Sequence, residues 1–377
     1  MDLEENIFML PGPVKMHPRV LNVMSKPAMA HRDKEFSAIN AEIRELLKYL
    51  FQSNNDVAII SGSGTAGLEA AISNLFRKGD KVVNIINGKF GERLNELSEV
   101  FAHPIPIVTE WGTAVDLNKL SATLEENDDI KAVTLCHNET STGLTNQAEE
   151  VGKLAKKHEL LYILDGITSV GGLPVKIEDW NVDIAILGSQ KCIAAPAGMA
   201  CLSISERAFE LLHSDHSYYL DLKKHIERLK NKDQTPYTPA IPLFLALREA
   251  LLMIKEEGLE NRLKRIEKLA NATRKAIKAL GLKLFPDENY ASNTVTAINY
   301  PEGVGDKEFR NILKEKHRVI VAGAQAHIKG KVFRIGHMGI CSFTDLLATF
   351  GAIEATLTEL GYKVEKGISV GAIADFM

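Results

Sequence analysis

The sequence predicts an α/β fold, with a large domain built on a mainly parallel sheet and a smaller α+β domain after it. Short apolar runs without polar alternation recur between residues 57 and 204, as expected of strands that are buried on both faces of a sheet. Helical patterns separate most of these runs, which is the order typical of α/β proteins. After about residue 255 the rhythm changes to a long charged helix and scattered short strands.

The elements of the large domain can be justified in chain order. The segment 35–51 has apolar residues at helical spacing, and the apolar run 57–60 is followed by a Gly/Ser turn and a helical pattern over 66–76. The apolar residues of the first helix are Phe36, Ile39, Ile43, Leu46, Leu47 and Leu50. Further strands are predicted at 81–86, 130–136, 160–164, 182–187 and 199–204, and 146–159 is typical of the helices between them.

The smaller domain begins with a charged helix over 259–280 and ends with a helix over 343–360. Strands are expected between them, near 294–299, 318–322 and 331–335. The Pro-rich, polar segment 231–242 predicts an irregular excursion before this domain. We therefore expect an N-terminal arm over 1–20, a large domain over 21–255 and a small domain over 256–377.

The composition is that of a soluble globular protein. The chain has 377 residues, of which 45% are hydrophobic and 25% are charged, and its net charge is −4. This charge argues against a nucleic-acid or anionic membrane surface. The acidic start lacks the layout of a signal peptide, and no apolar run is long enough to span a bilayer. The four cysteines have no CxxC spacing, so we expect a cytoplasmic protein without a metal site or disulfides.

A glycine loop lies between a predicted strand and a predicted helix. Gly62, Gly64 and Gly67 spell GxGxxG, and such a loop offers backbone N–H groups and a helix N-terminus to a phosphate. A dinucleotide site also needs an acidic residue at the end of the next strand, which here ends in Asn87 and Gly88. The flanking hydroxyl groups of Ser61, Ser63 and Thr65 suit a single phosphate monoester better. A tight turn without a ligand remains an alternative.

Two more polar residues stand at strand ends. Asp165 ends one apolar strand and Lys191 follows another, where open α/β sheets gather their ligand groups. Taken alone, the first could be a turn residue and the second a surface lysine. Together with the glycine loop they supply the three groups that pyridoxal phosphate requires: a phosphate anchor, a carboxylate for the pyridine nitrogen and an amine for the aldehyde.

At these residues the sequence resembles the class V aminotransferases, which are pyridoxal phosphate enzymes of fold type I, and especially their alanine–glyoxylate/serine–pyruvate branch. The resemblance rests on nine motifs in order along the chain, and it implies a large domain with a seven-stranded sheet. The motifs are LPGP (10–13), SGSGTAGLEAA (61–71), NGKFGER (87–93), HNETSTG (137–143), LDGITSVGG (164–172), GSQK (188–191), YTPAIP (237–242), ALREAL (246–251) and FRIGHMG (333–339).

The resemblance implies a role for each matching residue. Lys191 would bond to the cofactor's aldehyde, Asp165 would pair with the pyridinium, and Arg334 would bind the substrate's α-carboxylate. Ser63, Gly64, Thr65 and Gln190 would contact the cofactor's phosphate. Phe90 and Ile167 would lie on the two faces of the ring, and Thr140 would lie at its polar edge. Tyr237 and Thr238 would reach the phosphate of the neighbouring subunit of a homodimer.

Some of these residues depart from the family pattern or have simpler explanations. Phe90 stands where the family often has a bulkier aromatic residue, and it could belong to the core. Ala240 stands where some relatives have a threonine, so Thr238 would supply that hydroxyl. Arg334 could be a surface residue of a strand, and Thr140 could cap a turn. His31 and Cys192 receive no chemical role.

The function implied by the resemblance is transamination between a small amino acid, alanine or serine, and a small 2-oxo acid, glyoxylate or pyruvate. It would be ping-pong through pyridoxamine phosphate. An aspartate or aminoalkylphosphonate aminotransferase of the same fold is the alternative. A cysteine desulfurase would want a histidine where Gln190 stands, and an NAD-dependent oxidoreductase would leave Asp165 and Lys191 unexplained.

Overall fold

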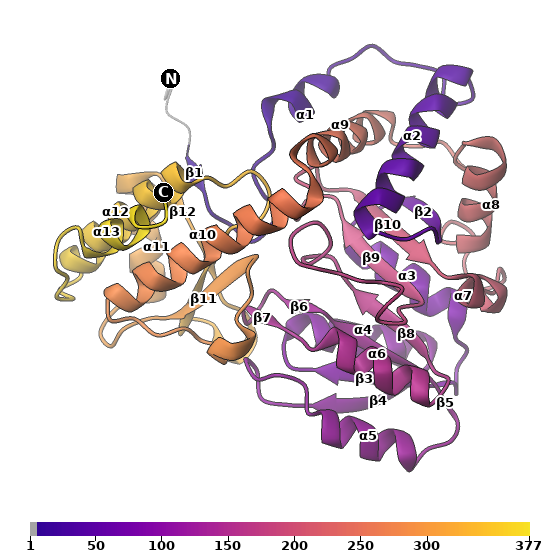
Figure 1. The fold of residues 1–377 in the computed structure, drawn as a ribbon, viewed down its shortest axis with the longest axis horizontal. Helices are drawn as coiled ribbons and strands as arrows, with labels where there is room; N and C mark the ends of the chain where they lie inside the picture. The colour runs from indigo at the N-terminus through magenta and orange to yellow at the C-terminus, as the bar shows by residue number, and fades with distance from the viewer. Residues whose placement is uncertain (1–5) are drawn as a thin grey trace.

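A computed structural model describes residues 6–377, and a seven-stranded sheet forms the centre of its larger part (Figure 1). The strand order is β2-β10-β9-β8-β5-β3-β4. β10 is antiparallel to both of its neighbours, and all other pairs are parallel. The mainly parallel seven-stranded sheet is thus confirmed. Its strands are β2 (Asp56–Ser61), β3 (Lys81–Ile86), β4 (His103–Val108), β5 (Ile130–Cys136), β8 (Leu161–Asp165), β9 (Ile184–Gly188) and β10 (Met199–Ile204).

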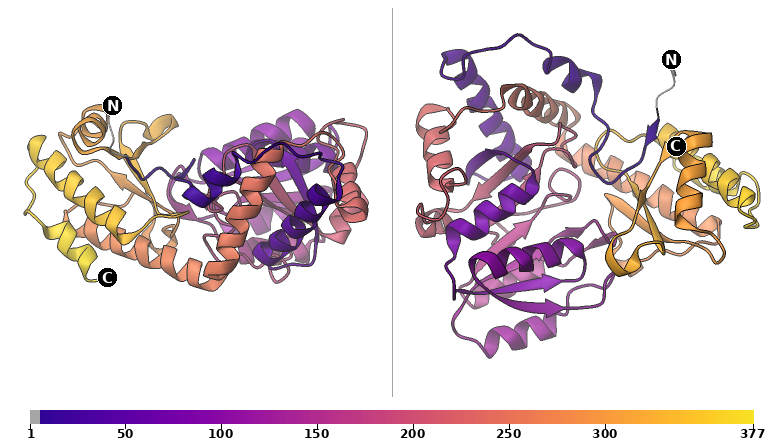
Figure 2. Two further views of the ribbon diagram at one scale, coloured as in Figure 1. Left: turned by 90° about the horizontal axis from the view of Figure 1, so that it is seen from above. Right: turned by 180° about the vertical axis from the view of Figure 1, so that it is seen from behind.

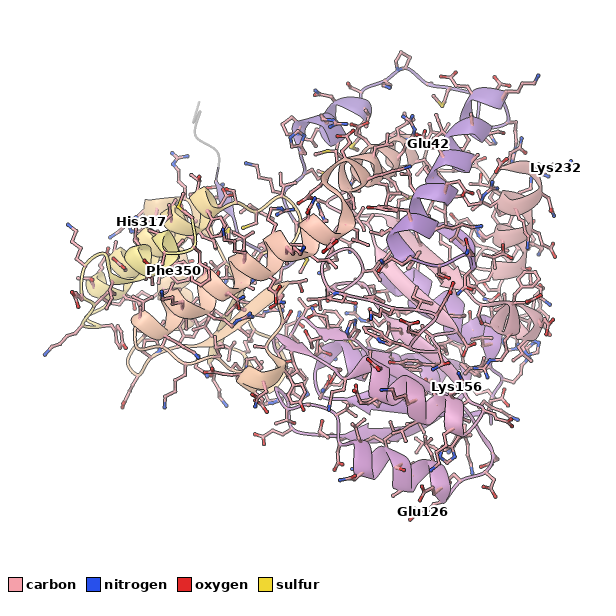
Figure 3. The ribbon with its side chains drawn as sticks, viewed as in Figure 1. Glu42, Glu126, Lys156, Lys232, His317 and Phe350 are labelled. Atoms are coloured by element: carbon pink, nitrogen blue, oxygen red, sulfur yellow. The ribbon has the colours of Figure 1, made fainter. Side chains whose placement is uncertain are left out.

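Helices cover both faces of this sheet, which is why its strands are apolar without alternation. In β2, Val57 and Ile59 face one apolar cluster, and Ala58 and Ile60 face the other. The first cluster is covered by α2 (Lys34–Phe51), α5 (Leu117–Glu125), α6 (Ala148–Lys157) and α9 (Ile241–Glu257), and the second by α3 (Gly64–Leu75), α4 (Lys89–Phe101), α7 (Glu206–Leu211) and α8 (Leu222–Lys232). Figure 3 shows the charged side chains of Glu126 and Lys232 at the outer rim of the molecule.

The smaller part of the molecule is an antiparallel sheet packed against helices. Its strand order is β11-β14-β13, with β11 (Val295–Asn299), β13 (Ala322–Gly323) and β14 (Val332–Gly336). The helices are α10 (Leu259–Ala279), α11 (Asp306–His317), α12 (Phe343–Glu359) and α13 (Ile368–Ala374), and Phe350 of α12 is fully buried among them (Figure 3). Gly258, with φ +82°, separates α9 from α10 and supports a domain boundary near residue 256.

The N-terminal segment crosses to the smaller part. β1 (Ile7–Phe8) pairs in parallel with β12 (Val319–Ile320), and Figure 2 shows the indigo segment of β1 beside the orange elements of the smaller part. A short helix, α1 (Pro18–Val23), then leads back to the large part. Of the predicted arm over 1–20, residues 1–5 lie outside the described residues. The division into these three parts stays a proposal.

β4 and α13 are among the elements that were not predicted. β4 contains Pro104 and Pro106, and only Ile107 of its six residues is buried, so it lacks a continuous buried apolar run. It lies at the edge of the sheet, where a strand tolerates proline because one side needs no ladder hydrogen bonds. α13 is short and packs on α10 and α12. Among residues 6–377, no helix is long and apolar enough to cross a membrane.

Candidate active site

The glycine loop joins β2 to α3 at the carboxyl edge of the sheet. Ser63 is the N-cap of α3, and its side chain makes no capping hydrogen bond, so its hydroxyl is available to a ligand. A Cβ at Gly64 would lie 2.5 Å from Cδ1 of Ile167, which explains the glycine there. The first N–H groups of α3, at Gly64 and Thr65, therefore form a helix N-terminus of the kind that binds anions.

Lys191 lies three residues beyond β9 and its side chain turns inward. The amine donates a hydrogen bond of 3.0 Å to the carbonyl oxygen of Pro11. A Cβ at Gly12, which has φ +117°, would overlap the lysine side chain. Burial, together with the charge of Arg334, lowers the pKa of Lys191 to about 8. This amine is therefore largely neutral at mildly alkaline pH and can act as a nucleophile or a base.

Asp165 ends β8 and is buried. Its Oδ1 accepts a hydrogen bond of 2.9 Å from the backbone N–H of Ile167. Burial raises the pKa of Asp165 to about 7, although that hydrogen bond opposes the rise. Within residues 6–377, no cationic side chain comes within 4.0 Å of this carboxylate. A buried carboxylate without a counter-ion is costly, and a ligand cation would relieve that cost.

The other predicted contacts of the large part lie around these two residues. The side-chain oxygen of Gln190 is buried without a hydrogen-bond partner in the described chain. The Thr140 hydroxyl is 2.8 Å from that of Thr168. Phe90 and Ile167 are partly buried side chains that pack against the same apolar cluster. Both Thr140 and Gln190 therefore present polar groups at the carboxyl edge of the sheet.

Arg334 comes from β14 of the smaller part and points toward the same edge. Its guanidinium donates to the carbonyl oxygens of Thr140 (2.9 Å) and Gly323 (2.6 and 3.1 Å). It is 7% exposed, and no carboxylate of residues 6–377 lies within 4.0 Å of it. Burial lowers the pKa of Arg334 to about 10, although Glu139 opposes the fall. A buried guanidinium held by carbonyl oxygens alone suits a carboxylate ligand.

Tyr237 and Thr238 are not joined to this cluster by any contact within the described chain. They lie between α8 and α9, where the Tyr237 hydroxyl donates 2.6 Å to the carbonyl oxygen of Tyr218. The rings of Tyr237 and Tyr219 stack at 5.5 Å. Tyr218 is 77% exposed and Thr238 is also exposed. The two residues thus belong to an exposed aromatic surface of this chain.

Three contributors were missed from the sequence. Glu139 is buried and accepts hydrogen bonds of 3.0 Å from the N–H groups of Phe90 and Gly91, so it fixes the start of α4. Arg93 donates a hydrogen bond of 3.3 Å to the Thr65 hydroxyl, and its guanidinium carbon lies 4.9 Å from the centre of the Phe90 ring. Pro11 holds the amine of Lys191. All three stand in the motifs quoted above, but no sequence spacing shows that these motifs meet.

The class of the protein follows from this architecture and from comparison with known families. Residues 18–343 match the family Aminotransferase class-V, and the chain belongs to it. Enzymes of this class depend on pyridoxal phosphate, so the predicted class, enzyme type and cofactor are confirmed, and this chain is a transaminase. The alternative of an NAD-dependent oxidoreductase is thereby excluded.

Particular relatives match over almost the whole chain. An uncharacterized aminotransferase of Methanocaldococcus jannaschii is 44% identical over 98% of this chain and 97% of its own length. The serine–glyoxylate aminotransferase of Methylorubrum extorquens is 34% identical over 99% of this chain and 96% of its own length. The crystal structure of ureidoglycine–glyoxylate aminotransferase from Bacillus subtilis superposes with a TM-score of 0.96 at 32% identity, covering 100% of this chain and 99% of that one.

The residues of the site fit pyridoxal phosphate. The N-terminus of α3 suits a phosphate, because the hydroxyl of its N-cap residue Ser63 makes no capping hydrogen bond. The side-chain amide of Gln190, whose oxygen has no hydrogen-bond partner, is free to orient toward that phosphate. The unpaired carboxylate of Asp165 suits a protonated ring nitrogen, and the inward-facing amine of Lys191 suits an aldehyde. When bound, the cofactor supplies an aldehyde that carries the amino group and a ring that accepts electrons.

Proposed function

We propose that this enzyme transfers the amino group of a small amino acid, alanine or serine, to glyoxylate or pyruvate. The observation that carries the proposal is the buried, uncompensated guanidinium of Arg334 near the amine of Lys191. Every amino acid and 2-oxo acid has an α-carboxylate, and a bidentate pair with Arg334 would orient it. The names of two similar proteins include glyoxylate as a substrate, which supports this acceptor.

In this proposal the residues of the chain bind, orient and move a proton. Arg334 binds the carboxylate, and the carbonyl oxygens of Thr140 and Gly323 keep its guanidinium fixed. The Lys191 amine would accept the proton from the substrate's Cα and deliver it to the aldehyde carbon of the bound cofactor, a role for which a pKa of about 8 is suited. Asp165 keeps the ring nitrogen protonated, because its carboxylate is buried and otherwise unpaired.

The single carboxylate-binding arginine also supports ping-pong kinetics. Arg334 can hold one acid at a time, so the first product would leave before the 2-oxo acid binds. Initial rates measured against one substrate at several concentrations of the other would give parallel lines in a double-reciprocal plot. Intersecting lines would contradict the proposal.

The same proposal includes a homodimer in the cytoplasm. Tyr237 and Thr238 would complete the phosphate site of the neighbouring subunit, because in their own chain they point to an exposed aromatic surface with Tyr218 and Tyr219. Tyr219 is 41% exposed. Large exposed aromatic side chains that gather on one surface are typical of protein interfaces.

Desulfurase chemistry is disfavoured by the cysteines. Burial raises the pKa of Cys192 and of Cys341 to about 12, and it also raises the pKa of Cys136 and Cys201. A nucleophilic cysteine needs the opposite shift, since the thiolate is the reactive form. None of these four thiols is therefore suited to attack a substrate.

A panel of amino donors with three acceptors tests the substrate proposal. Purified holoenzyme is assayed with alanine, serine, aspartate and an aminoalkylphosphonate against glyoxylate, pyruvate and 2-oxoglutarate. We expect the highest kcat/KM for alanine or serine with glyoxylate. A preference for aspartate or the phosphonate would overturn the choice of donor, and a preference for 2-oxoglutarate would overturn the choice of acceptor.

A further inference from the structure

The junction between α9 and α10 carries a carboxylate shared by two arginines. Glu257 is the last residue of α9, and Gly258 turns the chain into α10. One oxygen of Glu257 lies 2.6 Å from Nε of Arg265, and the other lies 2.8 Å from Nη1 of Arg262. Within residues 6–377, Glu257 is the one carboxylate within 4.0 Å of either guanidinium. Figure 1 shows that α10 runs from α9 into the smaller part.

Arg262 holds the two loops that carry the proposed catalytic residues. Its Nη2 donates to the carbonyl oxygen of Cys192, the residue after Lys191. Its Nε donates 3.0 Å to the carbonyl oxygen of Gly171, in the turn that follows Asp165. The arginine is only 4% exposed, so loss of these hydrogen bonds would leave buried polar groups without partners. Both loops are therefore anchored to one guanidinium.

Arg265 holds the segment that leaves the strand of Arg334. Its Nη1 donates 3.1 Å to the carbonyl oxygen of Cys341, and its Nη2 donates 3.0 Å to that of Gly339. A small apolar cluster joins the same segment to the lysine loop: its members are Val14, Cys192, Ala194 and Met338. The loop of Lys191 and the segment after Arg334 are thus connected in two ways. One connection is the ion pairs of Glu257 with Arg262 and Arg265, and the other is the apolar cluster.

Glu257 balances two charges that otherwise repel each other. Arg262 is buried and its backbone partners are neutral, so its charge is compensated only through Glu257 among the described residues. Removal of one partner from a buried ion pair is costly, because it leaves an uncompensated charge. Loss of the carboxylate would therefore push the two guanidiniums apart, and each would move the backbone that it holds.

We propose that Glu257, with Arg262 and Arg265, is a positioning unit that fixes the loop of Lys191 relative to the segment that follows Arg334. Glu257, Arg262 and Arg265 are not among the proposed cofactor- or substrate-binding residues, so the unit would act through Lys191 and Arg334. The part of the proposal that concerns the substrate rests on the proposed function, since it takes Arg334 as the carboxylate-binding residue.

The test compares Glu257→Gln with Glu256→Gln in the holoenzyme. Glu256 is adjacent, but its side chain is exposed and pairs with Arg19 on the surface, which makes it a matched control. Hydrogen exchange is followed by mass spectrometry in peptides that cover 189–196 and 336–342. We expect Glu257→Gln to speed exchange in both peptides about tenfold, because opening of the unit releases both loops, and Glu256→Gln to change neither.

A second variant tests whether a change at Arg265 also affects the loop of Lys191, or only the segment that Arg265 contacts. Arg265→Lys removes contacts only with Glu257 and with the segment after Arg334, yet it should also speed exchange in 189–196, which Arg265 does not touch. Both variants should raise the KM for the amino acid about tenfold, a factor that corresponds to about 1.4 kcal/mol of lost positioning, with a smaller change in kcat. Faster exchange confined to 336–342, with KM unchanged, would overturn the proposal.

The two proposals can fail separately. If the donor panel detects no transamination of small amino acids while exchange in 189–196 responds to Arg265→Lys, the proposed function fails and the positioning unit stands. If small amino acids react well and exchange in 189–196 does not respond, the positioning unit fails and the proposed function stands. Should Glu257→Gln not fold, Arg265→Lys alone decides between these outcomes.

Discussion

The amine of Lys191 donates a hydrogen bond of 3.0 Å to the carbonyl oxygen of Pro11, which stands 180 positions earlier in the chain. The same N-terminal segment is tied to the smaller part, because the N–H of Met9 donates to Ile320 and the N–H of Gly336 donates to Met9. Residues 9–12 thus lie between the strand of Arg334 and the lysine loop. The N-terminal segment is a wall of the candidate site.

Gly12→Ala should abolish cofactor attachment while the fold survives. Gly12 has φ +117°, and a Cβ there would overlap the Lys191 side chain. Gly79→Ala is the matched control, because Gly79 has φ +99° but a Cβ there would meet no atom within 4 Å. We expect both variants to lose about 1 kcal/mol of stability from backbone strain. Only Gly12→Ala should lose the visible absorption of the bound cofactor; equal absorption in both would contradict the proposed wall.

The pH dependence of cofactor attachment should report the lowered pKa of Lys191. Only the neutral amine attacks an aldehyde, so the attachment rate of cofactor-free protein should rise with pH to a midpoint near 8 rather than near the ordinary 10.5. Arg334→Met should raise this midpoint, because the charge of Arg334 is the second cause of the shift after burial. Stopped-flow absorbance measures the rate, and a wild-type midpoint above 10 would refute the prediction.

Asp165→Asn should stabilise the cofactor-free protein and disable the enzyme. Because burial raises the folded-state pKa of Asp165 from 3.8 to about 7, the folded state binds more protons than the unfolded state between these values. The free energy of unfolding therefore falls as pH rises through that window. Asparagine removes this cost, so Tm at pH 8 should rise by a few degrees. Activity should fall roughly 100-fold or more, since asparagine lacks the negative charge that would stabilise the protonated ring nitrogen of the cofactor. An unchanged pH profile of Tm would contradict this account.

Much of the fold and the centre of the site could be predicted from local pattern. The strands over 81–86, 130–136 and 199–204 have the predicted bounds, because each is an apolar run buried on both faces. The rule that ligand groups gather at carboxyl ends of strands identified Asp165 and Lys191. By contrast, Arg334 lies in a different sheet and was identified only through the family resemblance.

The parts that could not be predicted depend on contacts between distant segments. Glu139 caps α4 from another loop, and Pro11 meets Lys191 across most of the large part. Neither contact has a periodicity or a spacing that a single sequence displays. Glu257 likewise reads as one acid in a charged run, and only its two arginine partners distinguish it from Glu256.

Arg334→Lys should weaken substrate binding and leave the cofactor in place. Lysine keeps the charge but loses the planar fork that pairs with a carboxylate through two hydrogen bonds. We expect KM for the amino acid to rise at least about tenfold, with normal absorption of the bound cofactor. Arg310→Lys is the control, because Arg310 lies in the same part of the molecule but pairs with Asp306. An unchanged KM for Arg334→Lys would remove this residue from the site.

Two inactive variants should restore activity when mixed, if Tyr237 serves the partner's site. In homodimers, Lys191→Ala inactivates the site that contains that lysine, and Tyr237→Ala impairs the neighbouring one. A heterodimer of the two variants has one site with both defects and one with neither. Random reassortment makes half of the dimers heterodimers, so about a quarter of the wild-type activity should return after unfolding and refolding of an equal mixture. Each variant refolded alone is the control. If Tyr237 acted within its own subunit, every site would retain one defect and the mixture would stay inactive, because no combination of chains would then bring an intact Lys191 and an intact Tyr237 together in one site.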